Sequence, residues 1–383
     1  MSSHNNIVII GGGIIGCTTA YYLTHHPSYS PHSTTLTLLE PSVRGVAQGA
    51  SGKAGGLVAK WAEPNVLAEI SFSEHVRLAK ELGGEEKWGW RYVQCASWEG
   101  RSEAIDVGEG GEYEEGVKKK KRTRMKKGKG GKLPDDLTWI NSELTDEYEV
   151  LAPHGDTAQV HPYLFTSTML DLALSKGLRV IQGRATSIHH DNGAVTGVSY
   201  TSTSAGGGST TTTTTTATTL PATHVILATG AWSPIFLPTL PISGARVHSI
   251  TIHPEVDSTI TPHVLFTSIA LSGTRTSVTP EIYPRPGPAK EVYVCGAPDS
   301  SPLPPTVDDV EVEEAMCARI HEYVGSISSE LKEGKVMVRQ ACYMPMMSTG
   351  SGPIVGEADR IAKGLIVAAG HSCWVRKFFY FLN

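Results

Sequence analysis

The run Gly11-Gly12-Gly13-Ile14-Ile15-Gly16 limits how this 383-residue chain can fold more than any other feature. It fits the pattern G-x-G-x-x-G, and the segment before it, residues 6–10, is a short β-branched run typical of a buried parallel strand. Residues 13–25 then place apolar side chains at helical spacing, and residues 35–39 form a second strand that ends at Glu40. The chain is therefore predicted to open as β-α-β with parallel strands.

This opening predicts a site for a dinucleotide. Glycines between a strand and a helix allow a tight turn and let the backbone approach a pyrophosphate, which the N–H groups and positive dipole end of the helix then face. Glu40 ends the second strand, where a carboxylate can accept hydrogen bonds from both ribose hydroxyls. An acid at this position disfavours a 2′-phosphate, so NADP is not expected. A plain glycine turn and a solvated loop glutamate are the alternatives.

Composition excludes several classes of protein. Hydrophobic residues make up 40% and charged residues 19%, which permits a sizeable core and rules out wholesale disorder. The net charge is -5, from 33 Lys+Arg and 38 Asp+Glu, which argues against a general nucleic-acid binder. The six cysteines include no Cys-x-x-Cys pair, so we expect no disulfide framework, no metal site and a reducing, cytoplasmic location. The apolar stretch 7–23 is broken by its glycines, so no transmembrane segment is predicted.

The remaining periodicity predicts further helices and strands. Helices are expected at 67–82 and 162–176, and strands at 178–181, 194–200, 223–228 and 364–369. Residues 245–296 are strand-like and punctuated by proline, which favours an antiparallel sheet. Thr306 and Asp309 resemble a capping box that opens a helix running through Val310 and Met316.

Two segments are predicted to be disordered insertions, residues 99–134 and 202–219. The first carries seven acids followed by eight basic residues within 118–127, and the second is almost entirely Thr, Ser, Gly and Ala. A self-neutralising exposed loop explains the first best. Nuclear targeting, or attachment to an internal membrane through 118–127, is the alternative.

Three later segments add to the dinucleotide pattern. They are a second glycine-rich loop at 49–57, a strand that breaks into Thr-Gly-Ala-Trp at 229–232, and the strand end at 368–371. In this order and spacing, the chain resembles the D-amino-acid-oxidase-like family of FAD-dependent oxidoreductases, which includes glycine oxidase and sarcosine oxidase. The resemblance covers residues 6 to about 374, apart from the two insertions, and is greatest to fungal cytosolic members.

The resemblance implies an α/β fold with two domains. A Rossmann-like FAD-binding domain with a parallel sheet would be discontinuous, formed by residues 1–92, 154–235 and 336–383. A smaller α+β substrate domain with an antiparallel sheet would comprise residues 93–153 and 236–335. No second strand-glycine-helix pattern follows, so a separate NAD(P)H site is not expected.

The resemblance also implies which residues hold FAD. They are Gly11, Gly13, Ile15 and Gly16 for the pyrophosphate, Glu40 for the adenosine ribose, Ala50 and Ser51 for the diphosphate and ribityl region, Gly55, Gly56 and Leu57 beside the isoalloxazine, Ala185 for adenine, Ala228, Thr229, Gly230 and Trp232 closing over the dinucleotide, and Gly370 and His371 at the last strand end.

Family chemistry implies oxidation of the C–N bond of an amine or amino acid by hydride transfer to flavin N5, with oxygen as the acceptor. Tyr283 is the best candidate for a substrate contact, against a packed tyrosine as the alternative. Lys53 could hold negative charge on the reduced ring, as could Lys60, and Arg339 could hold a substrate carboxylate. Two other classes stay open: a dehydrogenase with another acceptor, and a flavin-binding trafficking or regulatory protein without turnover. An NAD-binding protein is disfavoured by the Thr-Gly-Ala-Trp strand end.

The chain departs from the family pattern in two places. Met344 stands where amino-acid oxidases of the family often carry the arginine that grips the substrate carboxylate, so a simple amine, or a carboxylate held by Arg339, becomes the expected substrate. After residue 374 the sequence is aromatic and free of glycine, unlike the family's terminal turn and helix, so weaker FAD binding is expected. Cys342 lies where sarcosine oxidases bond flavin covalently, with simple packing as the alternative.

Overall fold

A computed structural model describes residues 4–104, 132–203, 217–255, 259–287, 290–349 and 352–372. The basic run 118–127 and the tail after residue 372 therefore lie outside the described residues, as does most of each predicted insertion. The predicted opening is confirmed. It consists of β1 (Asn5–Ile10), α1 (Ile14–Thr24) and β2 (Thr34–Glu40), with β1 and β2 paired in parallel.

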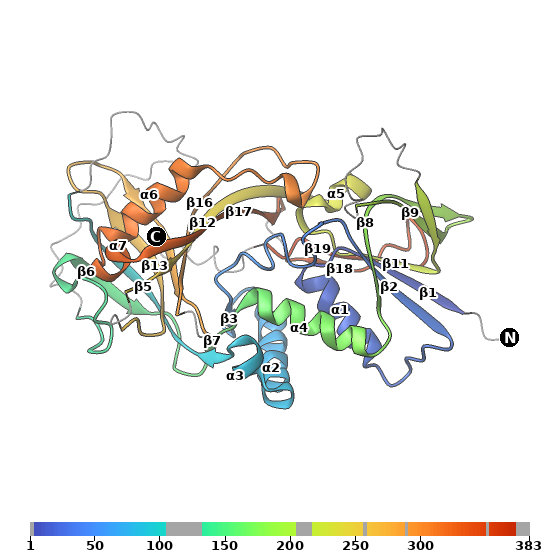
Figure 1. The fold of residues 1–383 in the computed structure, drawn as a ribbon, viewed down its shortest axis with the longest axis horizontal. Helices are drawn as coiled ribbons and strands as arrows, with labels where there is room; N and C mark the ends of the chain where they lie inside the picture. The colour runs from blue at the N-terminus through green and yellow to red at the C-terminus, as the bar shows by residue number, and fades with distance from the viewer. Residues whose placement is uncertain are drawn as a thin grey trace.

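A large mixed sheet has the strand order β10-β9-β8-β2-β1-β11-β19-β18. The strands that join β1 and β2 are β8 (Arg179–Asp191), β9 (Ala194–Ser202), β10 (Thr218–Pro221), β11 (His224–Leu227), β18 (Ile354–Glu357) and β19 (Leu365–Ala369). The neighbours from β8 to β19 run parallel, so their carboxyl ends meet at one edge. Figure 1 shows this sheet in the half of the molecule that holds the N-terminus.

Apolar side chains on both faces explain why these strands read as continuous hydrophobic runs. Ile9, Leu36 and Leu38 pack on one face with residues of α1 and α4 (Pro162–Ser175). Val8, Ile10 and Leu39 pack on the other face, with residues near η2 (Gly230–Trp232) and α5 (Ser233–Phe236). α4 starts with a proline and is followed by Gly177 at φ +101°, as the sequence predicts.

A second sheet has the order β17-β12-β16-β15-β13-β5-β6, with β14 paired to β13. Its strands are β5 (Gln94–Arg101), β6 (Thr145–Val150), β12 (Ile242–His253), β13 (His263–Ala270), β14 (Ser277–Val278), β15 (Glu281–Pro284), β16 (Val292–Asp299) and β17 (Lys335–Met347). Every pairing except β13 with β5 is antiparallel, which confirms the predicted sheet type.

The two faces of this sheet have different neighbours. α6 (Glu314–Gly325) and α7 (Ser329–Glu333) cover one face, where Ile250 and Val294 pack with Ile320 and Val324. On the other face, Tyr283 and Tyr293 pack with Leu57 and Trp61 of the second glycine-rich loop and the strand after it. That face is therefore the side of the sheet that meets the predicted FAD loops.

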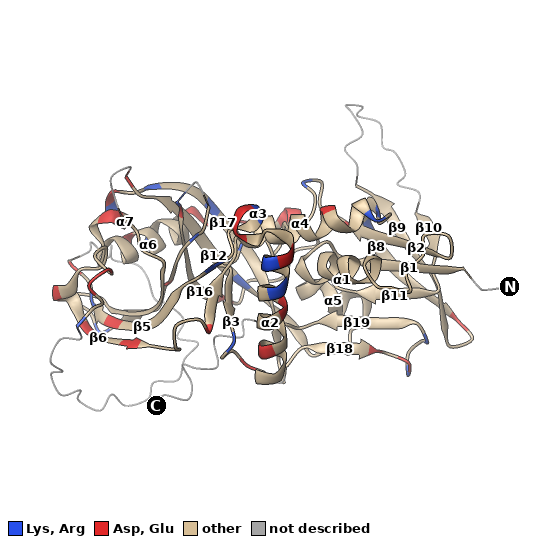
Figure 2. Ribbon diagram, turned by 90° about the horizontal axis from the view of Figure 1, so that it is seen from below, with Lys and Arg blue, Asp and Glu red and all other residues tan. Residues whose placement is uncertain are grey.

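Short elements join the two sheets. A three-stranded sheet contains β3 (Leu57–Ala59), β7 (Thr157–Gln159) and β4 (Arg91–Tyr92). Beside it lie α2 (Asn65–Leu82) and α3 (Gly84–Trp88), and η1 (Ser142–Leu144) precedes β6. α2 ends at Gly83, whose φ of +72° is the left-handed conformation that favours glycine at a helix end. Figure 2 shows charges of both signs along α2.

Three predictions about local structure need correction. The capping box of Thr306 and Asp309 forms, but it opens the single turn η3 (Val307–Asp309) instead of a long helix, and α6 starts separately at Glu314. Residues 99–101, predicted within the first insertion, pair with β6 and β13 as the end of β5. Thr218 and Thr219, predicted within the second insertion, pair with β9.

The apolar side chains of α2 are only partly buried. Leu67 is 42% and Ile70 is 59% exposed, whereas Ala68, Phe72 and Leu78 are buried.

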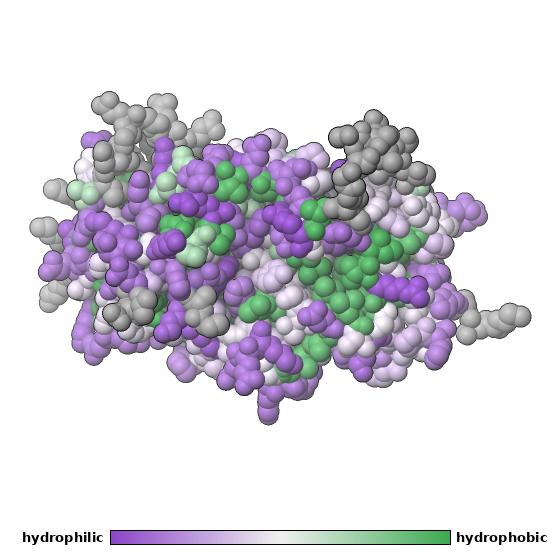
Figure 3. Space-filling model, in the orientation of Figure 1, coloured by the Kyte–Doolittle hydropathy of each residue, from purple (hydrophilic) through white to green (hydrophobic). Residues whose placement is uncertain are grey.

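Figure 3 shows a mainly hydrophilic surface with separate apolar patches on the face in view. Within the described ranges, no helix combines the length and apolar character needed to cross a bilayer.

Candidate active site

The first glycine loop is packed too tightly for any side chain. Gly11 has a φ of +107°, and a Cβ atom there would lie 2.6 Å from the backbone oxygen of Ala228. At Gly12 a Cβ atom would lie 2.6 Å from Oε2 of Glu40, and at Gly13 it would lie 3.0 Å from Oγ of Ser51. The loop therefore presents bare backbone at the carboxyl edge of the parallel sheet, the place where such sheets bind ligands.

Glu40 is 7% exposed and lies directly beside this loop. Its Oε2 accepts the Gly12 N–H at 2.7 Å, and its Oε1 accepts the Ser42 N–H at 2.9 Å. Burial raises the pKa of Glu40 to about 7, against the lowering effect of these two bonds and with a smaller contribution from the charge of Asp308. An ionised carboxylate offers about four lone-pair positions, so two stay available for the two hydroxyls of a ribose.

The second glycine-rich loop folds back over the first. The Ala47 N–H donates to the Gly12 carbonyl at 2.9 Å, and the side chain of Val46 lies against Gly12. Oγ of Ser51 accepts the Ile14 N–H at 2.8 Å, so Ser51 caps the N-terminus of α1 across 37 residues of chain. The predicted contacts at Ala50 and Ser51 thus lie where the free N–H groups and dipole of α1 favour an anion.

The end of this loop meets Tyr283. A Cβ atom at Gly55 would lie 2.5 Å from the Tyr283 ring, so the ring rests directly on the glycine backbone. Gly56 has a φ of +78°. The carbonyl oxygen of Gly55 accepts a hydrogen bond from the side-chain amide of Gln159 at 3.1 Å. The loop residues predicted to lie beside the isoalloxazine and the tyrosine predicted to contact substrate are therefore brought together.

Tyr283 belongs to a polar row on the same face of the antiparallel sheet. Its hydroxyl donates to Oε2 of Glu281 at 2.6 Å, and the Cys295 thiol lies 3.6 Å from the same oxygen. The row continues through Ser249 to Gln340, whose amide donates to the Ser249 hydroxyl at 3.2 Å. Tyr283 is 5% exposed, so it is a packed residue that also carries a hydroxyl on the site face.

Lys53 reaches this face from the second glycine-rich loop. Its Nζ donates to the Ala341 carbonyl at 3.0 Å, and its own carbonyl accepts from the Tyr293 hydroxyl at 2.8 Å. Burial lowers the pKa of Lys53. Burial raises the pKa of the neighbouring Cys342 thiol to about 11, although Lys53 opposes this. A covalent flavin bond would need the thiolate, which this environment disfavours. Lys60 instead forms an exposed ion pair with Asp156.

Arg339 is not brought together with Tyr283 and Lys53. It lies next to Gln340 in β17, so its side chain points to the opposite face of the sheet. There its Nε pairs with Oε2 of Glu314 in α6 at 3.0 Å, at the surface. The predicted role of Arg339 in holding a substrate carboxylate does not fit this placement, and the reason is the alternation of side chains along the strand.

Arg285, which directly follows β15, is 6% exposed. Its guanidinium donates to Glu291 at 2.7 Å and to the Ala54 carbonyl at 2.8 Å, and it lies 4.8 Å from the centre of the Tyr293 ring. Arg285 therefore ties the second glycine-rich loop to the antiparallel sheet as a structural residue.

Most of the remaining predicted contacts follow the ends of β11 and β19, whereas Ala185 lies in the middle of β8. Ala228 receives the close approach of Gly11, and Thr229 bonds the Ser233 hydroxyl at 3.0 Å. Trp232 donates from Nε1 to the Pro304 carbonyl at 2.8 Å. The other four are the buried Ala185 in β8, Gly230 at φ +55°, Gly370 at φ +76°, and His371, whose pKa burial lowers to about 4.

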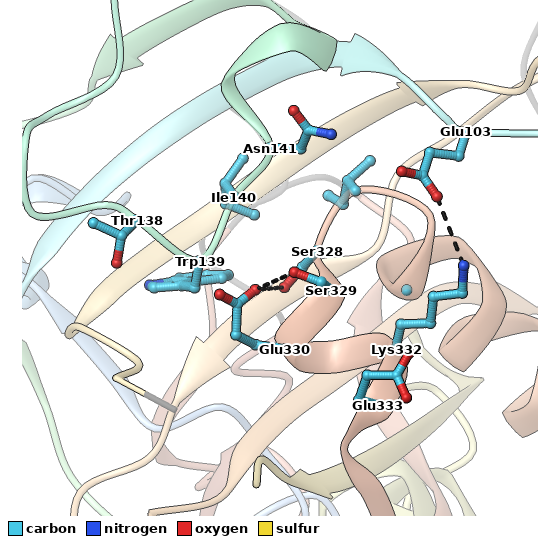
Figure 4. Close-up of a pocket in the computed structure, with 12 residues that line it drawn as sticks. Glu103, Thr138, Trp139, Ile140, Asn141, Ser328, Ser329, Glu330, Lys332 and Glu333 are labelled. Atoms are coloured by element: carbon cyan, nitrogen blue, oxygen red, sulfur yellow. Dashed lines mark hydrogen bonds and ion pairs between the residues drawn. The ribbon is translucent and has the colours of Figure 1, made fainter. Parts of the chain in front are cut away.

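One cavity lies far from this site. Figure 4 shows it between residues 138–141 and α7, with an ion pair of 3.7 Å between Lys332 and Glu103 at its side. Its volume is about 290 Å³. It lies at the α7 end of the antiparallel sheet, away from the glycine loops (Figure 1).

Comparison with known proteins decides the family. The family model described as FAD dependent oxidoreductase matches residues 6–375. This chain belongs to that family. A Schizosaccharomyces pombe protein, C1F5.03c, bears only a provisional oxidoreductase name; it is 32% identical over 380 residues, covering 98% of this chain and 91% of that protein.

Solved structures support the same fold. Iminodiacetate oxidase from Chelativorans sp. BNC1 matches with a TM-score of 0.66 and 18% identity, and glycine oxidase from Bacillus cereus with a TM-score of 0.66 and 17% identity. Each comparison covers 96% of this chain and 90% of the other. The predicted fold class, a parallel FAD-binding sheet with a second antiparallel sheet, is thereby confirmed.

As a member of the family of FAD-dependent oxidoreductases, the chain is an enzyme and uses FAD, and its residues fit that cofactor. The crowded glycines leave a bare cradle for a pyrophosphate, and Glu40 keeps acceptor positions for the ribose. Among the described residues, no group of three His, Cys, Asp or Glu side chains is placed to ligate a metal ion.

Sequence reasoning missed three residues of this site. Glu281 and Tyr293 face the same side as Tyr283, and a period-2 reading of β15 and β16 could have identified them. Asp308 approaches the loop after Glu40, at 2.7 Å from the Ser42 hydroxyl. No sequence signal predicts that contact, because 266 residues separate the two partners.

The pKa of Glu40 predicts how FAD binding depends on pH. The pKa of Glu40 is about 7 in the folded protein, above the ordinary 4.5. Glu40 therefore makes its whole contribution to the stability of the fold below about pH 4.5, and this contribution is lost as the pH rises through 7. Ribose hydroxyls would donate to the ionised carboxylate and lower this pKa, so FAD affinity should rise up to about tenfold between pH 6 and 7.5.

Titration of the protein with FAD across this pH range measures the effect. Glu40→Gln keeps the size of the side chain and cannot ionise, so its affinity should change little with pH. A wild-type affinity that stays flat or falls over the same range would contradict the ribose assignment.

Proposed function

We propose that this chain oxidises the C–N bond of an amine, with oxygen as the electron acceptor. The observation that carries the proposal is the contact of Tyr283 with Gly55. It brings Tyr283, and with it the bonded Glu281, to the loop that the family resemblance implies lies beside the isoalloxazine. Iminodiacetate oxidase and glycine oxidase, by their names, act on amines that carry carboxylates, which supports amine chemistry on this fold.

The charges around the site favour an amine that is not held through a carboxylate. Lys53 is bonded to the Ala341 carbonyl, Arg285 is paired with Glu291, and Arg339 lies on the opposite face. Met344 packs with the aromatic side chains of the site face, at the position where the family often has an arginine. The carboxylate of Glu281 would attract the ammonium group of an amine instead.

Each described residue then has a simple task. FAD, when bound, supplies the acceptor for two electrons. Glu281 would hold the ammonium group through Oε2 and take one of its protons, because only the neutral amine can give up hydride, and the Tyr283 hydroxyl, 2.6 Å away, would fix the orientation of that carboxylate. Lys53 brings a positive charge to the loop beside Gly55, where it would stabilise negative charge on the reduced ring.

Matched pairs of amines test this proposal, each amine being compared with the same compound carrying an α-carboxylate. We expect the simple amine to bleach the flavin faster and to yield hydrogen peroxide in air. Glu281→Gln should lower kcat/KM for the amine about 10- to 100-fold, because the charge-assisted hydrogen bond is lost. Arg339→Gln is the control on the opposite face of the same sheet and should leave kcat/KM unchanged.

The outcomes separate the alternatives. Bleaching without peroxide in air would contradict oxygen as acceptor and support a dehydrogenase. No bleaching with any amine would contradict the enzyme's proposed substrate class. A preference for the carboxylated partner that Arg339→Gln abolishes would restore Arg339 as the carboxylate-binding residue and overturn the assignment to Glu281.

The proposal extends to domain limits and location. We propose that residues 1–92, 154–235 and 336–383 form the FAD-binding domain and residues 93–153 and 236–335 the substrate domain.

A cytoplasmic location is proposed from the scattered cysteines. Fluorescence microscopy of the tagged protein checks it, and a variant with the basic residues of 118–127 replaced by serine tests the nuclear or membrane alternative.

A further inference from the structure

One segment links the two sheets directly over the predicted cofactor loops. This crossing segment, residues 299–309, leaves the end of β16 and returns to α6. At its start, Asp299 accepts Nε of Arg246 at 3.0 Å, and Arg246 also pairs with Glu313. The Tyr343 hydroxyl donates to the Pro302 carbonyl at 2.7 Å. These contacts anchor the segment to β12 and β17.

The other anchors lie on the parallel sheet. Nε1 of Trp232, just after β11, donates to the Pro304 carbonyl at 2.8 Å. Asp308, near the far end of the segment, is bound to three successive residues after β2. It accepts from the Ser42 hydroxyl at 2.7 Å, from the Val43 N–H at 3.0 Å and from the Arg44 guanidinium at 3.0 Å.

The strand order places the glycine loop between these anchors. β1 lies between β2 and β11 in the sheet, and Gly11–Gly13 follow the carboxyl end of β1. The crossing segment therefore bridges the carboxyl edge from the end of β11 to the end of β2. Figure 1 shows it in orange, extending from the antiparallel sheet toward the parallel sheet and returning to α6. On the way, Val307 approaches Gly49 of the second glycine-rich loop.

We propose that Asp308 fastens the crossing segment over bound FAD and so controls how slowly FAD leaves the enzyme. The proposal rests on the use of FAD and is independent of the substrate. FAD held by Gly11–Gly13 and Glu40 would lie beneath the segment, and its release would require Asp308 to separate from residues 42–44. Ser42 also donates its N–H to Glu40, so the same turn holds the ribose-binding carboxylate and the fastening contact.

Hydrogen bonds to the turn after β2, above all the bond from the buried Ser42, give this contact more of its strength than the ion pair does. The side chain of Arg44 is 53% exposed, so its pairing with Asp308 contributes little. The Ser42 and Val43 bonds are charge-assisted, and Ser42 is fully buried, whereas Val43 is 54% exposed. Although burial alone would raise it, these bonds hold the pKa of Asp308 below its usual range. The contact is therefore formed throughout the neutral pH range.

The test uses FAD-loaded full-length protein and measures release, which does not require turnover. Loaded protein is diluted into FAD-free buffer, and the rise in flavin fluorescence gives the dissociation rate. Asp308→Ala should accelerate release about 10- to 100-fold, since it removes two charge-assisted bonds. Asp308→Asn, which retains one acceptor oxygen, should show an intermediate rate.

Matched variants keep the result interpretable. Asp309→Asn changes the neighbouring carboxylate, whose bonds stay within the segment at Thr306, and should release FAD at the wild-type rate. Ser42→Ala attacks the contact from the other side and should accelerate release even where Asp308→Ala folds poorly. The double variant Ser42→Ala with Asp308→Asn should release FAD less rapidly than the product of the two single rate increases predicts, because both substitutions act on one contact.

Two results would overturn the proposal. Equal release rates for wild type, Asp308→Asn and Ser42→Ala would show that the crossing segment does not limit release. Slower release from Asp308→Asn would show that the negative charge of Asp308 repels the pyrophosphate more than its hydrogen bonds fasten the segment. An unchanged rate of release would leave the family's use of FAD intact, so failure here is distinguishable from failure of the proposed function.

Discussion

Replacing Glu40 with alanine is expected to weaken FAD binding about 30- to 150-fold, equivalent to about 2–3 kcal/mol. Two effects add. The variant loses the acceptor for the ribose hydroxyls, and it leaves the N–H groups of Gly12 and Ser42 without the partners that they have at 2.7 and 2.9 Å. Gly12 belongs to the loop that would hold the pyrophosphate, so both parts of the dinucleotide site are disturbed.

Titration calorimetry with FAD measures this loss. Glu357→Ala is the matched control, because Glu357 lies in the same sheet and its carboxylate also accepts a backbone N–H, that of Gly364 at 2.9 Å. The control should bind FAD as the wild type does. An affinity of Glu40→Ala within twofold of wild type would rule out Glu40 as the ribose ligand.

Replacing Gly11 with alanine is expected to abolish FAD retention and to destabilise the fold. The residue has a φ of +107°, a conformation that costs an alanine roughly 1–3 kcal/mol. The added Cβ atom would also lie 2.6 Å from the Ala228 carbonyl oxygen, in a contact made entirely of backbone. This close contact can be relieved only if β1 and β11 move apart at the glycine loop.

Thermal unfolding and FAD content after gel filtration measure the two effects. Gly45→Ala separates them, since Gly45 has a φ of +90° and no heavy atom lies within 4 Å of the site of its Cβ atom. That variant should show a loss of stability from strain alone and should keep FAD. If Gly11→Ala retained FAD to the same extent as Gly45→Ala, close packing of the first glycine loop would not be a requirement of the site.

Local sequence signals predicted the FAD half of the fold well. The β-α-β opening depends on neighbours within 40 residues, and the glycine spacing, the apolar run before it and Glu40 all indicate the same turn. The polypeptide near Tyr283 was also predicted as antiparallel sheet. Both results reflect short-range patterns, in which the period of the side chains is enough to distinguish helix from strand.

The face on which a strand side chain lies was harder to predict. Arg339 and Cys342 are three residues apart in β17, so they point to opposite faces. Only the pairing with β12 and the cover of α6 show which face is the site. The methionine at position 344, where the family often has an arginine, suggested that the nearby Arg339 holds a substrate carboxylate, and its position on the opposite face does not support that role.

Long-range contacts were beyond prediction from one sequence. Thr306 and Asp309 form the expected capping box, but the turn that follows ends at Asp309, and its Asp308 contacts Ser42 across 266 residues of chain. The local signal therefore predicted the capping box but not this long-range contact, which no pattern of neighbouring residues encodes.

The central claim is that this chain binds FAD between its two sheets and uses it to oxidise an amine. The most direct test is the visible spectrum of the purified protein during anaerobic titration with a simple amine. We expect flavin absorbance at about one FAD per chain, bleaching on addition of the amine, and recovery when oxygen is admitted. A protein that shows no flavin absorbance even after incubation with FAD, or a bound flavin that no amine bleaches, would contradict the account.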